Sequence, residues 1–324
     1  MTTITKNIKL AIQHLHTEEI IAIPTETVYG LAGNIYSSKA IHKIFQLKQR
    51  PLSNQLIVHI HSINELSKIA TEIPEVAYKL AEKFWPGPLT LLLPKQPSIP
   101  DYITAGNKTV AVRIPKHPLT LSLLESLDFP LAAPSANPFG AISPTTAQHV
   151  ADYFNKQLGL ILDGGASEKG VESTIIGFEN NEPILYRYGS ISVEEIETIT
   201  GTLRLNTLKE NKPEAPGMLP YHYSPSTGMI LVDDIEKYIN LFSHKRIGLL
   251  LFKNRKPNQN MITQEILSPE GNLEEACANL YAALHRLDKS ELDLIIAERL
   301  PDTGLGKTLN DRLQRASKKS ELNY

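Results

Sequence analysis

Hydrophobic and polar positions change their period repeatedly along the first two-thirds of the chain. Apolar residues at helical spacing predict an amphipathic helix from about Thr5 to Glu18, and the apolar run after it predicts a strand at Ile20–Ile23. The same reasoning predicts further helices at 38–50, 74–85, 119–127 and 145–154, and strands at 56–58, 89–93 and 109–115. This alternation predicts an α/β sheet, mixed rather than purely parallel because several late strands are joined by short turns.

The pattern breaks between about Leu208 and Thr227. The segment LKENKPEAPGMLPYHYSPST holds four prolines and little apolar periodicity, which is typical of an extended linker. It also carries Pro216-Gly217-Met218 and His222-Tyr223, rigid and aromatic residues that a pure spacer does not need. We therefore expect residues 208–227 to form a linker that folds back over a pocket as a lid.

Strand and helix patterns resume after the linker. MILVDD, RIGLLLF and LDLIIAER predict strands, and helices are expected near 235–242, 273–287 and 309–316. Residues 228–324 should thus form a small Rossmann-like βαβ domain with a parallel sheet, beside a first domain at 1–207. The sequence TGLGKT at 303–308 resembles a phosphate-binding loop, but that motif needs glycine where Pro301 stands, so this reading is rejected.

Composition limits the classes of protein that fit. The 324 residues, 41% of them hydrophobic, can supply a core for two domains of a soluble globular protein. The net charge of −2 argues against a general nucleic-acid binder but permits a local cationic pocket. The only cysteine, Cys277, lies at an apolar helical position and is read as core filler. Without an apolar run of membrane-spanning length or a signal peptide, the expected location is the cytoplasm.

Candidate chemistry begins in FQLKQRPLSNQLIVHI, residues 45–60. Lys48 and Arg50 fall where a helix ending at Arg50-Pro51 gives way to a strand, with His59 beyond it. A lysine and an arginine on one short loop suit a polyphosphate. Two cations that complement the dipole of a helix C-terminus would look the same.

Other polar groups follow apolar strands. PTETVYGLAGN places Thr25, Glu26 and Thr27 after the strand at 20–23, suited to a small polar ligand or to a capped turn. Arg113 lies within a strand, so if buried it needs either an anionic substrate group or an internal carboxylate.

Two later segments add small donors. The loop PSANPFGAIS carries Ser135, Asn137 and Ser143, with prolines that stiffen it, although ordinary surface loops share this composition. The segment VEST, Val171 to Thr174, enters a strand, and Arg187 ends another.

Taken in order, PTETVYGLAGN, KQRP, LIVHI, PGPLT, VAVRIP, PSAN, SPT, DGG, VEST, YRYG and PGM…HYSP resemble the threonylcarbamoyl-AMP synthase family in its longer form. The resemblance implies a YrdC-like twisted mixed sheet around a concave positive cleft. It implies a nucleotidyltransferase that joins L-threonine, bicarbonate and ATP into threonylcarbamoyl-adenylate and releases pyrophosphate. The product would pass to the machinery that places the threonylcarbamoyl group on adenosine 37 of tRNAs reading codons that begin with A, with at most weak tRNA binding by this chain.

The resemblance also implies roles for individual residues. L-threonine would be surrounded by Thr27, His59, Arg113, the backbone at Ala133, and Ser173. ATP would be held by Arg50, Asn54, Thr109, Ser135, Ser143, Arg187 and Tyr223, with Lys48 near the phosphates. Lys48 and Arg50 would act in catalysis by neutralising phosphate charge, with Mg²⁺ accompanying the nucleotide. No residue is assigned as a metal ligand.

Two rival readings come from other classes. Related domains can bind double-stranded RNA, but near-neutral charge and scattered small donors favour a small anionic ligand. Carbamoyl transfer in hydrogenase maturation would require zinc-binding regions that a single cysteine cannot supply.

Overall fold

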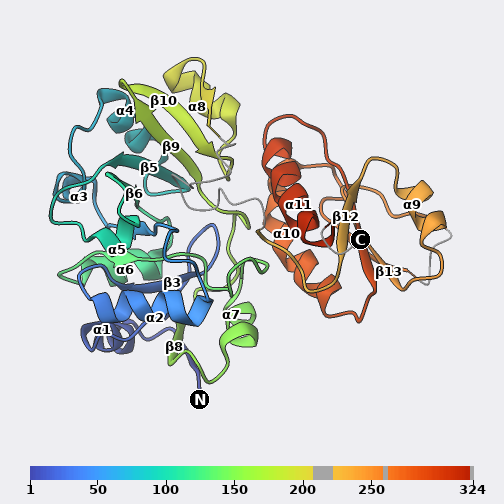
Figure 1. Cartoon of the computed structure of the whole chain (residues 1–324), viewed down its shortest axis with the longest axis horizontal. Coiled ribbons are helices and arrows are strands. Elements are labelled where there is room, and N and C mark those ends of the chain that lie inside the picture. The colour runs from blue at the N-terminus through green and yellow to red at the C-terminus, as the bar shows by residue number, and fades with distance from the viewer. Residues whose placement is uncertain (207–221, 258–261, 322–324) are drawn as a thin grey trace.

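The computed structural model describes residues 1–206, 222–257 and 262–321 and arranges them around two sheets (Figure 1). Residues 1–206, here called the N-terminal region, build an 11-stranded sheet of mixed direction. Its strands lie in the order β1 (Thr3–Thr5), β8 (Leu160–Leu162), β2 (Ile21–Ile23), β3 (Gly30–Asn34), β7 (Leu131–Ala132), β4 (Ile57–His59), β6 (Thr109–Arg113), β5 (Leu89–Pro94), β9 (Thr174–Glu179), β10 (Glu182–Arg187) and β11 (Arg204–Leu205).

The sheet is mixed because parallel and antiparallel pairs are interspersed across it. For example, β4 pairs with β6 in parallel and with β7 antiparallel, so the predicted mixed α/β sheet is confirmed. The helices of this region are α1 (Ile8–His16), α2 (Ser38–Lys48), the 3₁₀ turn η1 (Ile63–Glu65), α3 (Leu66–Ile69), α4 (Glu75–Phe84), α5 (Asp101–Thr104), α6 (Pro118–Glu125), α7 (Ala147–Phe154) and α8 (Val193–Thr200).

Two element boundaries differ from the prediction for local reasons. The first helix begins at Ile8 rather than near Thr5. Thr3–Thr5 form β1, which pairs with β8, and the side chain of Asn7 then caps α1. Helix α2 ends at Lys48 rather than Arg50, because Gln49 adopts the left-handed conformation (φ 52°) and Pro51 disfavours helical geometry at Arg50. This early end directs Arg50 out of the helix.

Residues 228–321, here called the C-terminal region, build the predicted small parallel sheet. Its order is β12 (Met229–Val232), β15 (Leu294–Glu298), β13 (Ile247–Leu251) and β14 (Thr263–Ile266), with helices α9 (Ile235–Leu241), α10 (Leu273–Asp288) and α11 (Gly306–Glu321). Strand β14 was not expected, and α11 extends beyond the predicted 309–316 at both ends. None of the described helices is long and apolar enough to cross a membrane.

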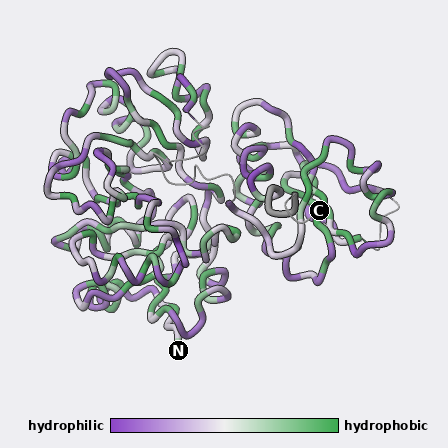
Figure 2. The backbone as a smooth tube through the Cα atoms, in the orientation of Figure 1, coloured by the Kyte–Doolittle hydropathy of each residue, from purple (hydrophilic) through white to green (hydrophobic). Residues whose placement is uncertain are grey.

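Apolar side chains form the interior of both regions and also join them. Figure 2 shows hydrophobic segments along strands of both sheets. One buried cluster combines Val28, Ile142 and Val171 of the N-terminal region with Tyr223 and with residues of α10 and α11 such as Leu280. Helices α10 and α11 lie on the side of the small sheet that faces the N-terminal region (Figure 1). The two regions therefore share a core.

The expected linker and lid lie mostly outside the described residues. Of 208–227, only 222–227 are described, so the Pro216-Gly217-Met218 segment is not placed. The division at 207 and 228 stays a proposal.

Candidate active site

A pocket lies where several elements of the large sheet end. Its walls are the loop after β2, the loop after α2, the ends of β4, β6 and β10, the loop after β7, the turn before β9, and residues 222–223. Among the predicted site residues, those that line it are Thr27, Arg50, His59, Arg113, Ala133, Ser135, Ser173, Arg187 and Tyr223. Side chains dispersed over more than half of the sequence thus meet in one hollow.

Arg113, the last residue of β6, lines the pocket. Its Nη2 lies 2.7 Å from Glu26 Oε1 and donates to Thr27 Oγ1 at 2.9 Å, while its Nε donates to Gly87 O at 3.2 Å. The second carboxylate oxygen of Glu26 accepts the backbone N–H of Lys116. An internal carboxylate therefore partners Arg113, which also remains exposed to the pocket. Each buried charge is paired, as burial requires.

His59, at the end of β4, is uncharged at neutral pH. Burial and then the charge of Arg113 lower its pKa to about 3. Its Nδ1 contacts the carbonyl oxygen of Ile57 at 3.2 Å, and because a carbonyl only accepts, Nδ1 carries the proton. Nε2 is left as a hydrogen-bond acceptor beside Arg113.

Arg50 and Arg187 bring further positive charge to the pocket. Arg50 donates to the carbonyl oxygens of Asn54 and Gln55, and Arg187 donates to the carbonyl and hydroxyl oxygens of Ser173. Burial, and then the charge of Arg187, lower the pKa of Arg50 to about 10. Two guanidinium groups that disfavour each other's charge in a buried pocket would be relieved by an anionic ligand.

Lys48 is buried behind the pocket rather than lining it. Its Nζ donates to the carbonyl oxygens of Ser135 and Asn137, each at 2.5 Å. Burial, followed by the charge of Arg50, lowers its pKa well below the ordinary value. The observed contacts make Lys48 a support for the loop that carries Ser135.

Three further predicted residues also stand outside the lining. The Asn54 carbonyl supports Arg50, and the Ser143 hydroxyl donates to Glu172 Oε1 at 2.6 Å. Thr109 begins β6 and lines a separate surface hollow with Arg204. Nucleotide contacts by Asn54, Thr109 and Ser143 stay predictions.

His222 and Tyr223 bring the end of the predicted linker into the pocket. Both are buried, and Tyr223 adopts the left-handed conformation (φ 66°). The Tyr223 hydroxyl and His222 Nδ1 have no hydrogen-bond partner among the described residues. Buried polar atoms without partners are uncommon in folded proteins and are typical of sites that take a ligand.

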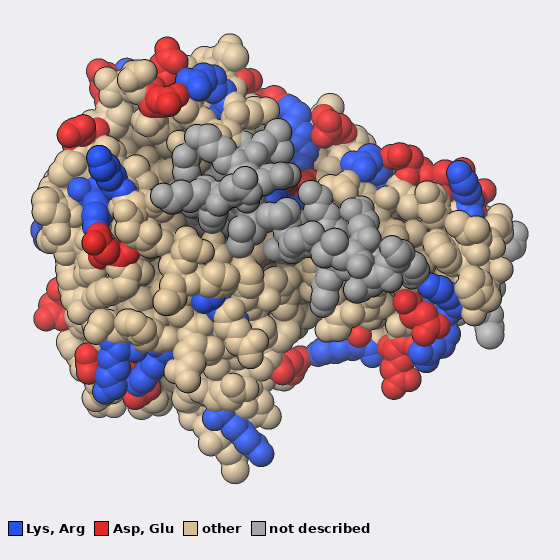
Figure 3. All heavy atoms as spheres, viewed as in Figure 1, with Lys and Arg blue, Asp and Glu red and all other residues tan. Residues whose placement is uncertain are grey.

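The positive charge of the pocket is local, because the described residues on the drawn face form no broad basic field. On the face drawn in Figure 3, lysine and arginine side chains are interspersed with aspartate and glutamate. A double-stranded RNA would need a continuous basic stripe, and the described residues drawn on this face do not form one.

Comparisons with known proteins cover both regions of the chain. Residues 13–189 match the Sua5/YciO/YrdC family model, described as telomere recombination, and residues 191–318 match the model described as the C-terminal domain of threonylcarbamoyl-AMP synthase. A threonylcarbamoyl-AMP synthase of Pyrococcus abyssi is 40% identical, covering 96% of this chain and 94% of the relative. One from Bacillus subtilis is 38% identical, covering 94% of this chain and 90% of the relative.

The chain belongs to the threonylcarbamoyl-AMP synthase family. A crystal structure of P. abyssi Sua5 complexed with L-threonine superimposes with a TM-score of 0.92 at 38% identity, covering 98% of each chain. Escherichia coli YciO, with a TM-score of 0.52 and 24% identity over 58% of this chain and 96% of its own, shares the fold.

Within this synthase-family chain, two ionisable residues at the pocket were given no binding or catalytic role from the sequence, although one of them, His222, was named in the expected lid. Glu172 and His222 both line the pocket. The signal for Glu172 was present, since VEST sets a carboxylate directly beside buried Val171 and Ser173. Two partners of the Glu172 carboxylate, Tyr281 and Arg312, lie more than 100 positions away in the sequence, and no local pattern predicts them.

Proposed function

We propose that this chain synthesises L-threonylcarbamoyladenylate from L-threonine, bicarbonate or CO₂, and ATP, with release of pyrophosphate. The proposal rests on one observation: a single pocket is lined by Arg113, Thr27 and His59 together with Arg50 and Arg187. An amino acid and a nucleoside triphosphate could then lie side by side. Family membership supports the same reaction.

The threonine end follows from the chemistry of its donors. Arg113 would bind the carboxylate of threonine, since a guanidinium fork matches a carboxylate. His59 Nε2, an acceptor, would receive a hydrogen bond from the amine or hydroxyl group. Thr27, Ser173 and the backbone at Ala133 would complete this end.

The nucleotide end would take the triphosphate. Arg50 and Arg187 are proposed to bind phosphate oxygens, and Ser135 and Tyr223 to contact the nucleoside. Mg²⁺ is proposed to arrive bound to the triphosphate, because Glu26 and Glu172, the carboxylates at the pocket, are already engaged by Arg113 and Arg312. The metal would neutralise phosphate charge.

The reaction then needs positioning rather than an enzyme nucleophile. The threonine amine adds to CO₂ to give a carbamate, whose oxygen attacks the α-phosphorus as the bond to the β-phosphate oxygen breaks. Cys277 plays no part, because it is buried in α10 and burial raises its pKa to about 12. Nucleotidyl transfer by alignment and charge neutralisation is the proposed mechanism.

The product would serve threonylcarbamoylation of tRNA in the cytoplasm. Threonylcarbamoyladenylate is a reactive mixed anhydride, so a tRNA-directed transferase would have to consume it. Weak binding of tRNA to this chain is compatible with that handover.

Pyrophosphate release from ATP tests the reaction. We expect release only when threonine and bicarbonate are both present, and its loss when either is omitted. Release that is independent of threonine would point to a different adenylating enzyme and would contradict the proposal.

A further inference from the structure

The C-terminal region contacts the pocket walls directly. Thr308 Oγ1 donates to the carbonyl oxygen of Gly189 at 2.9 Å, and Lys307 pairs with Glu194 at 2.8 Å. These two residues belong to the sequence that resembled a phosphate loop, and they bind protein instead. Their contacts set α11 against the turn that follows Arg187.

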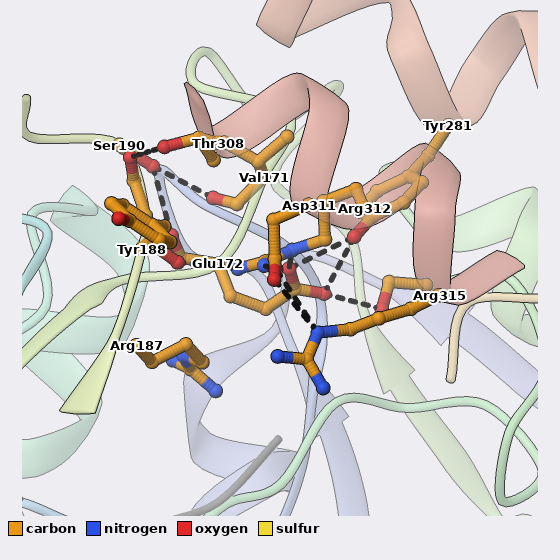
Figure 4. A network of polar contacts seen from close by, with 12 residues as sticks. Val171, Glu172, Arg187, Tyr188, Ser190, Tyr281, Thr308, Asp311, Arg312 and Arg315 are labelled. Carbon is orange, nitrogen blue, oxygen red and sulfur yellow. Dashed lines mark hydrogen bonds and ion pairs between the residues drawn. The ribbon is translucent and has the colours of Figure 1, made fainter. Parts of the chain in front are cut away.

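Arg312 of α11 lies at the centre of this contact (Figure 4). Its side chain is 1% exposed, and its Nε donates to Glu172 Oε2 at 2.9 Å. Glu172 also accepts from Tyr281 of α10 at 2.9 Å and from Ser143 at 2.6 Å. Nη2 of Arg312 donates to the carbonyl oxygen of Tyr188 at 2.6 Å. One guanidinium therefore joins two segments of the N-terminal region.

Those two segments carry neighbouring pocket residues. Glu172 directly precedes Ser173, and Tyr188 directly follows Arg187. Arg187 in turn donates to both oxygens of Ser173 at 2.8 to 3.1 Å. Arg312 thus fixes the flanks of the Arg187–Ser173 contact without lining the pocket itself.

The same guanidinium also holds the end of the linker. Its Cζ lies 4.7 Å from the ring centroid of Tyr223, and Tyr281 stacks on that ring with centroids 5.8 Å apart. A cation over an aromatic face and a stacked ring both restrict the orientation of Tyr223. The hydroxyl of Tyr223 has no hydrogen-bond partner among the described residues.

Charge supports the same arrangement. Burial raises the pKa of Glu172, but the charges of Arg312 and Arg187 and the Ser143 hydrogen bond outweigh it and lower the pKa. Glu172 therefore stays ionised between two arginines. Without Arg312, it would pair with Arg187 alone and would compete with an anionic ligand for that side chain.

We infer that Arg312 is a positioning residue of the C-terminal region that sets Arg187 and Tyr223 for the triphosphate nucleotide. The inference rests on the proposed function and assigns the C-terminal region a direct part in nucleotide binding. A purely structural role would make Arg312 important for stability alone.

The test uses the full-length protein with Arg312→Met and Arg312→Lys. The matched control is Arg286→Met on α10. Arg286 also makes a bidentate pair, with Glu265, but its side chain is 57% exposed. Melting temperatures fix an assay temperature at which every variant is folded. Calorimetric titration with ATP and threonine-dependent pyrophosphate release are then measured.

We expect Arg312→Met to weaken ATP binding and to lower kcat/KM for ATP at least tenfold. KM for threonine should change less than twofold, Arg312→Lys should recover part of the loss, and Arg286→Met should match the parent. Adding Glu172→Gln to Arg312→Met should restore the melting temperature but not ATP affinity, since Tyr223 still lacks its cation.

Unchanged ATP binding in folded Arg312→Met, or equal losses for ATP and threonine, would overturn the inference. A parent protein that shows no threonine-dependent release would contradict the proposed function. The two failures are therefore distinct.

Discussion

The guanidinium of Arg113 lies 2.7 Å from the carboxylate of Glu26, and both side chains are almost completely buried. The pair keeps Arg113 oriented, but it also lowers the net positive charge that meets a ligand at this end of the pocket. A bound carboxylate would share Arg113 with Glu26.

Replacing Glu26 with glutamine should destabilise the protein and increase its response to threonine. Leaving Arg113 buried without its counter-charge should cost about 3 kcal/mol of unfolding free energy. The carboxylate of L-threonine would replace the missing charge, so threonine should stabilise the variant more than the parent in denaturant titrations. Equal threonine effects would count against threonine at Arg113. The exposed Glu75→Gln serves as control.

Removing either Arg50 or Arg113 should slow turnover on the order of 10²-fold or more, because each positions or neutralises a reacting group. Arg113→Ala should in addition raise KM for threonine, and Arg50→Ala should in addition raise KM for ATP. Arg113→Lys and Arg50→Lys keep the charge and guard against loss of fold. Near-normal rates in both alanine variants would show that the pocket is assigned wrongly.

Lys48→Met should lower the unfolding free energy by about 1–3 kcal/mol, because the buried carbonyl oxygens of Ser135 and Asn137 lose their donor. Equilibrium unfolding in urea measures the loss. Lys39→Met removes an exposed ion pair with Glu18 and should change stability little. A stable Lys48→Met variant would mean that this loop does not depend on the ammonium.

Gly170→Ala should cost more stability than Gly201→Ala. Both glycines have positive φ, 67° and 71°, so each substitution carries backbone strain of about 1 kcal/mol. Only at Gly170 would the added carbon meet a neighbour, 2.4 Å from the Cys277 carbonyl oxygen of α10. The difference in unfolding free energy measures how closely the VEST turn packs on α10, and equal losses would argue against that packing.

Stability should fall as the pH drops from about 6.5 to about 4. His149 of α7 and His285 of α10 stack with centroids 3.9 Å apart, and burial lowers the pKa of each to about 4. The unfolded chain binds protons at these histidines over that range while the folded chain does not, so acid favours unfolding. His149→Phe should flatten the pH dependence, whereas the exposed His244→Gln should not. An equally steep profile in His149→Phe would exclude this pair as the cause.

The sequence supports prediction of the strand ends better than of the contacts behind them. Thr27, Arg113 and Arg187 each adjoin an apolar run, so their placement at a sheet edge follows from strand periodicity. From the sequence, the partner of Arg113 could be identified only as an anion. An internal carboxylate and an anionic ligand group both provide the negative charge that a buried arginine requires.

Contacts between distant segments could not be predicted. Arg312 stands in the polar run GKTLNDRLQRASKKSE, whose composition is typical of a solvent-exposed helix face. In the structure Arg312 is buried and pairs with Glu172, which lies 140 positions earlier. From the sequence, Lys48 is likewise interpreted as a free cation. In the structure its ammonium group is buried and donates to the carbonyl oxygen of Ser135. Strand β14, TQEI, has too few apolar residues to be predicted as a strand from the sequence. It is a strand because it pairs with β13.

The position of α11 has a consequence for biosynthesis. It spans Gly306–Glu321, close to the end of the chain, while the carboxylate that Arg312 binds belongs to Glu172. A ribosome translates from the N-terminus, so the N-terminal sheet emerges long before this arginine. Until α11 has been synthesised, Glu172 lacks the guanidinium of Arg312, which follows it by 140 positions, and a product truncated before α11 would lack this ion pair.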